Sequence, residues 1–283
     1  QGWMTLREVL NQAAGRLGSV SDTPRLDAEL LMAHALSIER ETLLLRHLDA
    51  TPPEEFAHLL ARRLAHEPLA YITGTRDFWT ISLHVAPGVL IPRPDSETLI
   101  EAAVAYFGKA GPETVLDLGT GSGALLLAVL AEWPRAKGLG VDASPEALAI
   151  AQGNATRLGM ADRAAFHLGN WADGLNTRFD LILCNPPYVG TGDDLPLQVR
   201  GYEPACALFA GADALDDYRR IVPQLPALLA LGGMIAMEIG PTQAESVSAL
   251  FRASGLRPST HRDLGSRDRA VVHFSLGIDQ KGG

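Results

Sequence analysis

A glycine-rich turn is the first place in this chain where residue types and spacing could support ligand chemistry. The stretch from Asp117 to Gly123 reads Asp-Leu-Gly-Thr-Gly-Ser-Gly and directly follows an apolar run that is typical of a buried strand. Glycines permit a tight strand-to-helix turn and let a ligand approach the backbone closely. Gly119, Gly121 and Ala124 also match a dinucleotide-binding pattern. A dinucleotide, a different nucleoside cofactor and a purely structural turn are all compatible with this turn alone.

The negative charge of a carboxylate beside the turn distinguishes between these possible ligands. Asp117 stands at the end of the strand, two residues before Gly119, where a carboxylate would repel the pyrophosphate of a dinucleotide. S-adenosylmethionine carries an ammonium and a sulfonium, and both are attracted by a carboxylate. Asp142 lies about 20 residues after the turn and could accept hydrogen bonds from the ribose hydroxyls. We therefore predict that the turn binds S-adenosylmethionine.

Further candidate cofactor contacts follow the next strands. Asp142 could instead cap a helix, but Ser144 can take that role with Pro145 at the first helical position, which leaves Asp142 free. Asn170 could accept a hydrogen bond from the adenine amine, and Trp171 could lie against the adenine ring. Core packing explains Trp171 equally well. All of these residues come at the carboxyl ends of successive expected strands, where open α/β sheets bind ligands.

The tetrapeptide Asn185-Pro186-Pro187-Tyr188 follows the fourth expected strand of the sheet. A conjugated nitrogen is a poor nucleophile, so a site that methylates it should accept hydrogen bonds from its two N–H groups. The Asn185 side-chain oxygen and the Pro186 carbonyl can supply these acceptors, the prolines stiffen the turn, and Tyr188 offers a flat face. A proline-rich strand exit is the structural alternative. The tetrapeptide therefore predicts methylation at a planar nitrogen, with a glutamine amide and an adenine amine equally compatible and no general base required.

The elements that would position these residues form a repeated strand–turn–helix pattern after Gly111. Five strands alternate with helices, which indicates a mainly parallel sheet covered on both faces. The last two strands follow each other without a helix and should form an antiparallel pair. The fold class is therefore α/β, a seven-stranded Rossmann-like methyltransferase sheet with a small N-terminal all-helical domain. The expected strands are 114–118, 137–142, 164–168, 179–184, 233–239, 256–262 and 270–276.

The N-terminal quarter of the sequence predicts helices only. Thr5 and Glu8 form a capping-box pattern, and further helices are expected from Thr23-Pro24, over 39–47 and from Thr51-Pro52. Alternating residues from Trp79 to Val85 predict a strand, the proline-rich stretch 87–94 a hairpin or extended linker, and Asp95 the cap of a helix over 98–107. We expect a helical domain over 1–70, a β-hairpin or linker over 71–95 and a methyltransferase domain over 96–283.

Composition limits the possible partners and compartments. The net charge is −9, from 24 basic and 33 acidic residues, which argues against the basic surface of a nucleic-acid-binding protein. The two cysteines form neither a metal-binding pattern nor a disulfide framework, and the eight histidines are scattered, so no metal site is expected. No segment resembles a signal peptide or a membrane span. We expect a soluble cytoplasmic monomer that binds neither membranes nor nucleic acid stably.

At this level of detail the chain resembles the HemK-type protein-glutamine methyltransferases, which modify peptide chain release factors. The likeness includes the helical stretch 22–31, the interdomain stretches 68–74 and 90–97, the glycine turn, the tetrapeptide and positions between 199 and 219. The tetrapeptide is shared with adenine methyltransferases, whereas the interdomain and post-tetrapeptide stretches are more particular to the family. Asn170 stands where the family often has Asp, and Ala214 stands where Gly is frequent.

The resemblance implies an acceptor and a set of contacts. The acceptor is the glutamine of a Gly-Gly-Gln tripeptide in class one release factors, the helices dock that protein, and S-adenosylhomocysteine is the second product. A ribosomal-protein glutamine, an adenine in DNA or RNA and a non-enzymatic role in partner binding are the alternatives. Catalysis and substrate binding are assigned to Asn185, Pro186, Pro187 and Tyr188. The expected cofactor contacts are Asp117, Gly119, Thr120, Gly121, Ser122, Gly123, Asp142, Asn170, Trp171 and Asn185.

Overall fold

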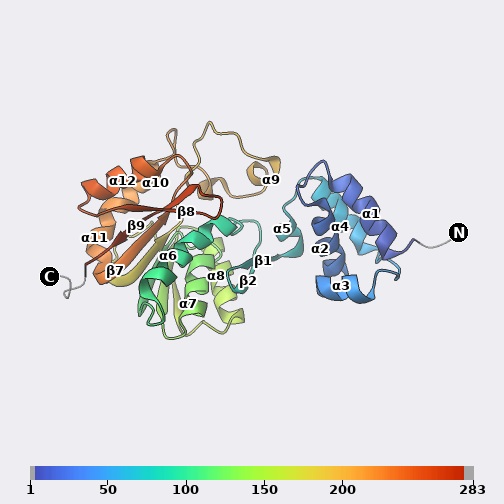
Figure 1. Cartoon of the computed structure of the whole chain (residues 1–283), viewed down its shortest axis with the longest axis horizontal. Coiled ribbons are helices and arrows are strands. Elements are labelled where there is room, and N and C mark those ends of the chain that lie inside the picture. The colour runs from blue at the N-terminus through green and yellow to red at the C-terminus, as the bar shows by residue number, and fades with distance from the viewer. Residues whose placement is uncertain (1–3, 277–283) are drawn as a thin grey trace. The chain divides into compact units, whose positions relative to one another are not determined.

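The computed structural model describes residues 4–276, which form two compact units (Figure 1). One unit contains the chain up to Thr75 together with Leu195–Tyr202. The other contains Arg76–Asp194 and the chain from Glu203 onward. The short segment 195–202 therefore belongs to the N-terminal unit, although it lies more than a hundred residues further along the chain.

The N-terminal unit is helical, as the sequence predicts. The Thr5 hydroxyl accepts a hydrogen bond from the Glu8 amide and the Glu8 carboxylate accepts one from the Thr5 amide, so the expected capping box is confirmed. Apolar side chains at helical spacing, such as Leu6, Leu10 and Leu31, form its buried core. The helices are α1 (Leu6–Leu17), α2 (Pro24–Leu36), α3 (Arg40–Arg46), α4 (Glu55–Leu64), α5 (Leu69–Thr73) and α9 (Leu197–Arg200).

A buried ion pair connects the parts of this unit. Arg63 of α4 donates to Asp27 of α2 at 2.9 Å, and both side chains are less than 10% exposed. The same guanidinium donates to the Val20 carbonyl and to the Gln198 side chain in α9. Because a buried guanidinium needs several acceptors, these contacts require α2, α4 and segment 195–202 to be placed together.

The second unit contains a seven-stranded sheet with the strand order β5-β4-β3-β6-β7-β9-β8. The first five of these strands along the chain are parallel, and β9 is antiparallel to both β7 and β8. The expected antiparallel pair at the end of the chain is therefore confirmed. The strands are β3 (Thr114–Leu118), β4 (Lys137–Asp142), β5 (Ala164–Leu168), β6 (Phe179–Cys184), β7 (Leu229–Glu238), β8 (Ser259–Arg262) and β9 (Asp268–Phe274).

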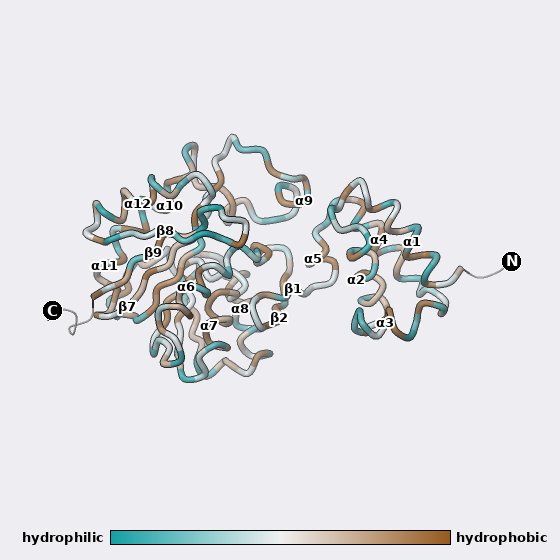
Figure 2. Tube along the Cα trace, viewed as in Figure 1, coloured by the Kyte–Doolittle hydropathy of each residue, from teal (hydrophilic) through white to brown (hydrophobic). Residues whose placement is uncertain are grey.

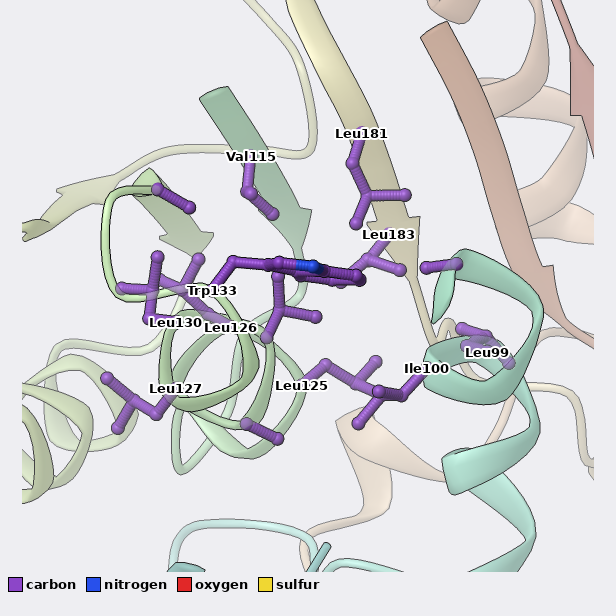
Figure 3. Close-up of a cluster of buried hydrophobic side chains, with 14 of the residues drawn as sticks. Leu99, Ile100, Val115, Leu125, Leu126, Leu127, Leu130, Trp133, Leu181 and Leu183 are labelled. Atoms are coloured by element: carbon purple, nitrogen blue, oxygen red, sulfur yellow. The ribbon is translucent and has the colours of Figure 1, made fainter. Parts of the chain in front are cut away.

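Alternate residues of the strands pack into two separate cores on the two faces of the sheet. Val115 and Leu181 contribute to the core beneath the helices α6, α7 and α8, and Leu116 and Ile182 contribute to the core beneath α10 and α12. Figure 3 shows Trp133 at the centre of the first core, beside leucines of α7 and of the strands. Brown in Figure 2 marks hydrophobic residues, which are frequent along the strands of the sheet. The helices are α6 (Glu97–Phe107), α7 (Ala124–Glu132), α8 (Pro145–Arg157), α10 (Asp216–Ile221), α11 (Leu225–Leu228) and α12 (Ala244–Ala253).

The segment before the sheet differs from the sequence prediction. The strand expected over 79–85 is shorter and covers only β2 (Ile81–His84). The chain turns at Trp79, whose φ is 53°, so that β2 pairs with the preceding strand β1 (Thr75–Phe78). Residues 87–93 form no strand, so the extended-linker alternative is correct there. The expected Asp95 cap is wrong, because the short helix Pro94–Ser96 runs directly into α6. The Asp95 carboxylate instead pairs with Arg269 of β9 at 3.1 Å.

No helix within residues 4–276 is long and apolar enough to cross a membrane. The same residues contain no group of three His, Cys, Asp or Glu side chains placed to hold a metal ion. The three-part division of the chain by function stays a prediction.

Candidate active site

A cavity of about 490 Å³ lies at the carboxyl ends of β3, β4 and β6, within the second unit. Parallel strands end at the same edge of a sheet, and the loops that follow them therefore converge on one place. Most of the predicted site residues line this cavity, whereas Gly123, Pro186 and Tyr188 are not among its lining residues. The predicted residues in the lining are Asp117, Gly119, Thr120, Gly121, Ser122, Asp142, Asn170, Trp171, Asn185 and Pro187.

The glycine turn has the conformation that its sequence requires. Gly119, Gly121 and Gly123 all have positive φ angles, of 72°, 55° and 83°. A Cβ on Gly119 would lie 2.9 Å from the Trp171 ring, so only glycine fits beneath that ring. The amides of Gly119 and Thr120 both donate to the Val141 carbonyl, which holds the turn against β4. The turn is therefore rigid and open to a ligand on its cavity side.

Asp142 organises the backbone around the cavity. Its two carboxylate oxygens accept from the Gly121 and Ser144 amides, each at 2.9 Å. The Ser144 hydroxyl caps α8 by accepting from the Ala147 amide, and this confirms the predicted cap. Asp142 is therefore not the cap of α8, as predicted, but its carboxylate is engaged by the two backbone amides. Each oxygen retains a second lone pair toward the cavity, which can accept a ribose hydroxyl.

Asp117 is the most perturbed carboxyl group of the cavity. It is 1% exposed, and the Thr120 hydroxyl donates to its Oδ2 at 2.7 Å. Within the described chain, its Oδ1 has no hydrogen-bond partner. Burial, assisted by repulsion from Asp142, raises the pKa of this carboxyl to about 7. A buried acceptor without a partner and with a destabilised charge fits a cationic ligand group, such as the ammonium of S-adenosylmethionine.

Trp171 packs in the core, as one interpretation of the sequence held, while its predicted contact with adenine stays a prediction. Its backbone has a φ of 51°, and its ring packs on the second core as well as lining the cavity over Gly119. The indole N–H donates to Asp217 of α10 at 3.2 Å. Asp217 also lines the cavity, and burial raises the pKa of its carboxyl. The sequence did not indicate Asp217, because nothing local relates it to Trp171.

The tetrapeptide presents two acceptors that no group of the described residues uses. The Asn185 side-chain N–H donates to the Ser96 hydroxyl at 3.4 Å, which directs the Asn185 oxygen away from Ser96. Within residues 4–276, neither Asn185 Oδ1 nor the Pro186 carbonyl accepts a hydrogen bond. Pro186 and Pro187 are buried, so the turn cannot move freely. Two unused acceptors at a rigid turn suit a planar NH₂ group.

Tyr188 is held from two sides. Its hydroxyl lies 3.4 Å from the Glu238 carboxylate, and burial raises the pKa of the phenol. Its carbonyl accepts from the Gln243 side chain at 3.3 Å. The next residue, Val189, pairs with the chain near Phe209 as an isolated parallel bridge. The tetrapeptide is therefore supported by α12 and by the following loop.

A buried carboxylate, that of Glu203, holds the loop after the tetrapeptide next to the cavity. Glu203 accepts from the Arg93 guanidinium at 2.5 Å and from the Ile91 amide at 3.0 Å. This pair fixes Pro204 beside the cavity, which it lines. Ala214, at a position where the resembled family often has glycine, has a φ of 62°. The loop thus keeps a left-handed residue here, at a steric cost that glycine would avoid.

A parallel sheet with an antiparallel last pair, a glycine turn after its first strand and a carboxyl-end cavity together define a Rossmann-like methyltransferase. Comparison with solved structures agrees on the fold. A methyltransferase from Pyrococcus furiosus superposes with a TM-score of 0.54 at 17% identity, over 78% of this chain and 100% of that one. The ribosomal protein L11 methylase from Lactobacillus delbrueckii gives 0.51 at 20% identity, over 68% and 85%.

Sequence comparison narrows this class to one family. The PrmC N-terminal domain matches residues 8–74, and a methyltransferase domain matches residues 111–246. The release factor glutamine methyltransferase of Caulobacter vibrioides is 42% identical over 95% of this chain and 96% of its own. The enzyme of the same name from Cereibacter sphaeroides is 43% identical over 95% and 98%. The chain belongs to the release factor glutamine methyltransferase family.

Proposed function

We propose that this chain transfers a methyl group from S-adenosylmethionine to the side-chain amide nitrogen of the glutamine in the Gly-Gly-Gln tripeptide of class one release factors. The observation that carries the proposal is the pair of unused acceptors, Asn185 Oδ1 and the Pro186 carbonyl, at a rigid turn beside the cavity. The name shared by relatives of about 40% identity over nearly the whole chain supports the acceptor. The proposed reaction would take place in the cytoplasm, where release factors act.

The residues of the cavity fit the cofactor group by group. When bound, S-adenosylmethionine supplies an electrophilic methyl group on a sulfonium. Asp117 would hold the ammonium with its unpartnered Oδ1, and Asp142 the ribose hydroxyls. Asn170 and Trp171 would contact the adenine from the loop after β5. These assignments place negative charge beside the cationic end of the cofactor and an aromatic ring beside its base.

The tetrapeptide would prepare the acceptor nitrogen. Asn185 Oδ1 and the Pro186 carbonyl would each accept one N–H of the glutamine amide, which fixes the plane of the amide and directs the nitrogen lone pair out of it. The same acceptors stabilise the positive charge that grows on nitrogen as its bond to carbon forms. The methylated nitrogen then releases one proton to water. Because the acceptors are held in advance, little reorganisation is needed.

The first experiment compares acceptors. Purified release factor, its Gly-Gly-Ala variant, ribosomal protein with an exposed glutamine, and adenine-containing DNA are incubated with radiolabelled S-adenosylmethionine. Label on the intact release factor alone is the expected result. Label on DNA or on the ribosomal protein would reject the proposed acceptor while retaining the methyltransferase class. The acidic charge of −9 already disfavours a nucleic-acid substrate.

The role of the tetrapeptide is tested with Asn185→Ala. Loss of one preorganised hydrogen-bonding group in an active site typically costs about 10²–10³ in turnover, and we expect a loss of that size. Cofactor affinity, measured by calorimetry, should change by much less than turnover. Unchanged turnover would contradict the assignment of Asn185.

A further inference from the structure

Glu238 is a buried carboxylic acid that the proposed reaction does not yet use. It ends β7, next to the strand that leads into the tetrapeptide, and its exposed fraction is 0%. Among the described residues its Oε2 has no hydrogen-bond partner. Its backbone carbonyl accepts from the buried Tyr218 hydroxyl at 2.7 Å, which anchors the end of β7. A buried, unpaired carboxyl oxygen is costly, and its presence needs an explanation.

The contacts of Glu238 lead to the tetrapeptide by two routes. Its Oε1 lies 3.4 Å from the Tyr188 hydroxyl. Ser96, which lines the cavity, is close enough to the Glu238 carboxylate for its hydroxyl to lower the pKa of that group. The Ser96 hydroxyl in turn accepts from the Asn185 side-chain N–H at 3.4 Å. Both distances are long, as hydrogen bonds at catalytic sites often are before substrate binds.

We propose that Glu238 is a positioning residue that fixes the side-chain amide of Asn185 by acting on it through the Ser96 hydroxyl. This inference rests on the proposed function, in which Asn185 Oδ1 accepts an N–H of the substrate amide. A hydroxyl has one proton to donate. If Ser96 donates that proton to Glu238, only its lone pairs face Asn185, and only the NH₂ end of Asn185 can bind there. The oxygen of Asn185 is then presented to the substrate.

Without the carboxylate, the orientation of Asn185 is no longer determined. The Ser96 proton becomes free to point at Asn185, which favours the flipped amide with its oxygen toward Ser96. The NH₂ group of Asn185 would then oppose the NH₂ group of the substrate. Tyr188 would also lose the acceptor for its hydroxyl. Because the flip replaces an acceptor by a donor, it should reduce turnover rather than cofactor binding.

The orientation should depend on pH, because only the ionised carboxylate accepts from both hydroxyls. Burial raises the pKa of Glu238 to about 7, against the lowering effect of Ser96, Arg269 and Tyr188. A protonated Glu238 can itself donate to a hydroxyl and release the constraint. The charged and titratable groups around Glu238 are Asp95, Cys184, Tyr188, Tyr218 and Arg269.

The decisive experiment is a double-mutant cycle with Glu238→Gln and Ser96→Ala, measured as kcat and KM for release factor at pH 8. Glu238→Gln should lower kcat about 10-fold or more, with cofactor affinity changed less than about twofold, because a neutral isostere retains the packing. In the Ser96→Ala background the same substitution should have much less effect, since the connection is already cut. Asp263→Asn serves as the matched control, because Asp263 also contacts Arg269 but neither Ser96 nor Tyr188.

A second readout needs neither substrate nor activity. The side-chain NH₂ resonances of Asn185, identified by their loss in Asn185→Asp, should shift with a midpoint near pH 7 in the wild type and show no such step in Glu238→Gln. The proposal would be overturned if Glu238→Gln lowered kcat by the same factor with and without Ser96→Ala. It would also be overturned if the Asn185 resonances had the same pH dependence in Glu238→Gln as in the wild type. If the wild type fails to methylate release factor but the resonances behave as expected, the acceptor assignment is wrong and the positioning role stands.

Discussion

Asp117 should couple cofactor binding to pH, and its substitution should have opposite effects on stability and affinity. Burial raises the pKa of its carboxyl from 3.8 to about 7 in the folded chain. Between these values the folded protein keeps a proton that the unfolded chain releases. The free energy of unfolding therefore falls by up to about 1.4 kcal/mol per pH unit as the pH rises from about 4 to about 7. The total cost of the ionised carboxylate above pH 7 is on the order of 4 kcal/mol.

Cofactor binding should show the reverse dependence. The ammonium of S-adenosylmethionine needs the ionised carboxylate, so protonation of Asp117 removes the binding-competent form. With a pKa of about 7, the apparent Kd should be about 25-fold weaker at about pH 5.5 than at about pH 7.5. The cofactor's own ammonium remains mostly protonated over this window.

Calorimetric titrations across this window, with wild type and Asp117→Asn, test the reasoning. The variant should bind more weakly at neutral pH and lose the pH dependence, while its free energy of unfolding above pH 7 rises. Asp180→Asn is the matched control, because Asp180 accepts backbone N–H groups at the opposite, amino end of β6 and does not line the cavity. A wild-type Kd that changes less than threefold, or a pH slope that persists in Asp117→Asn, would refute the role of Asp117.

The remaining predictions concern stability. Arg63→Ala removes the partner of buried Asp27 and should destabilise the helical unit by about 3–5 kcal/mol in denaturant unfolding. The neighbouring Arg62 forms a partly exposed pair with Glu67, and Arg62→Ala should lower the free energy of unfolding by less than about 1 kcal/mol. Equal losses of stability in Arg63→Ala and Arg62→Ala would contradict the larger contribution of the buried pair. Gly111→Ala places a Cβ 2.3 Å from the Trp133 ring at a φ of 71°. We expect a loss of about 2–5 kcal/mol from strain and overpacking. Gly153 lies in α8, and no atom lies within 4 Å of a Cβ added there. Gly153→Ala should therefore stabilise the protein by about 0.5–1 kcal/mol. Equal melting temperatures of Gly111→Ala and Gly153→Ala in a thermal unfolding scan would contradict this prediction.

Local pattern was sufficient to predict much of the fold. Four strands, β3 to β6, begin and end at the predicted residues. Of these, β3 and β6 are buried almost throughout and have mostly apolar sequences, whereas β5 is an edge strand with mostly exposed residues. The bounds of two later strands, β7 and β8, were less well predicted. β7 begins four residues earlier than expected, at Leu229, and β8 is limited to Ser259–Arg262. Edge positions and bulges depend on the neighbouring strand, which a local pattern does not contain.

The candidate cofactor residues were also predictable, because glycines with positive φ and polar residues at the carboxyl ends of parallel strands are local signals. Asp117, Gly119 and Asp142 converge on the cavity for this reason. The detailed use of Asp142 was not predictable, since its partners are the backbone amides of Gly121 and Ser144, whose directions only the folded turn defines.

The sequence by itself determined the α/β class, the bounds of strands β3 to β6, and the positions of the glycine turn and the tetrapeptide at the ends of β3 and β6. Only the tertiary structure decided which distant groups support them. Ser96 meets Asn185 across 89 residues, Arg93 meets Glu203 across 110, and segment 195–202 joins the helical unit. Periodicity specifies which face of an element is buried but not which polar partner it meets there. The pairing of buried polar groups is set by the packing of whole elements, because each group must find its partner wherever the fold brings one within reach.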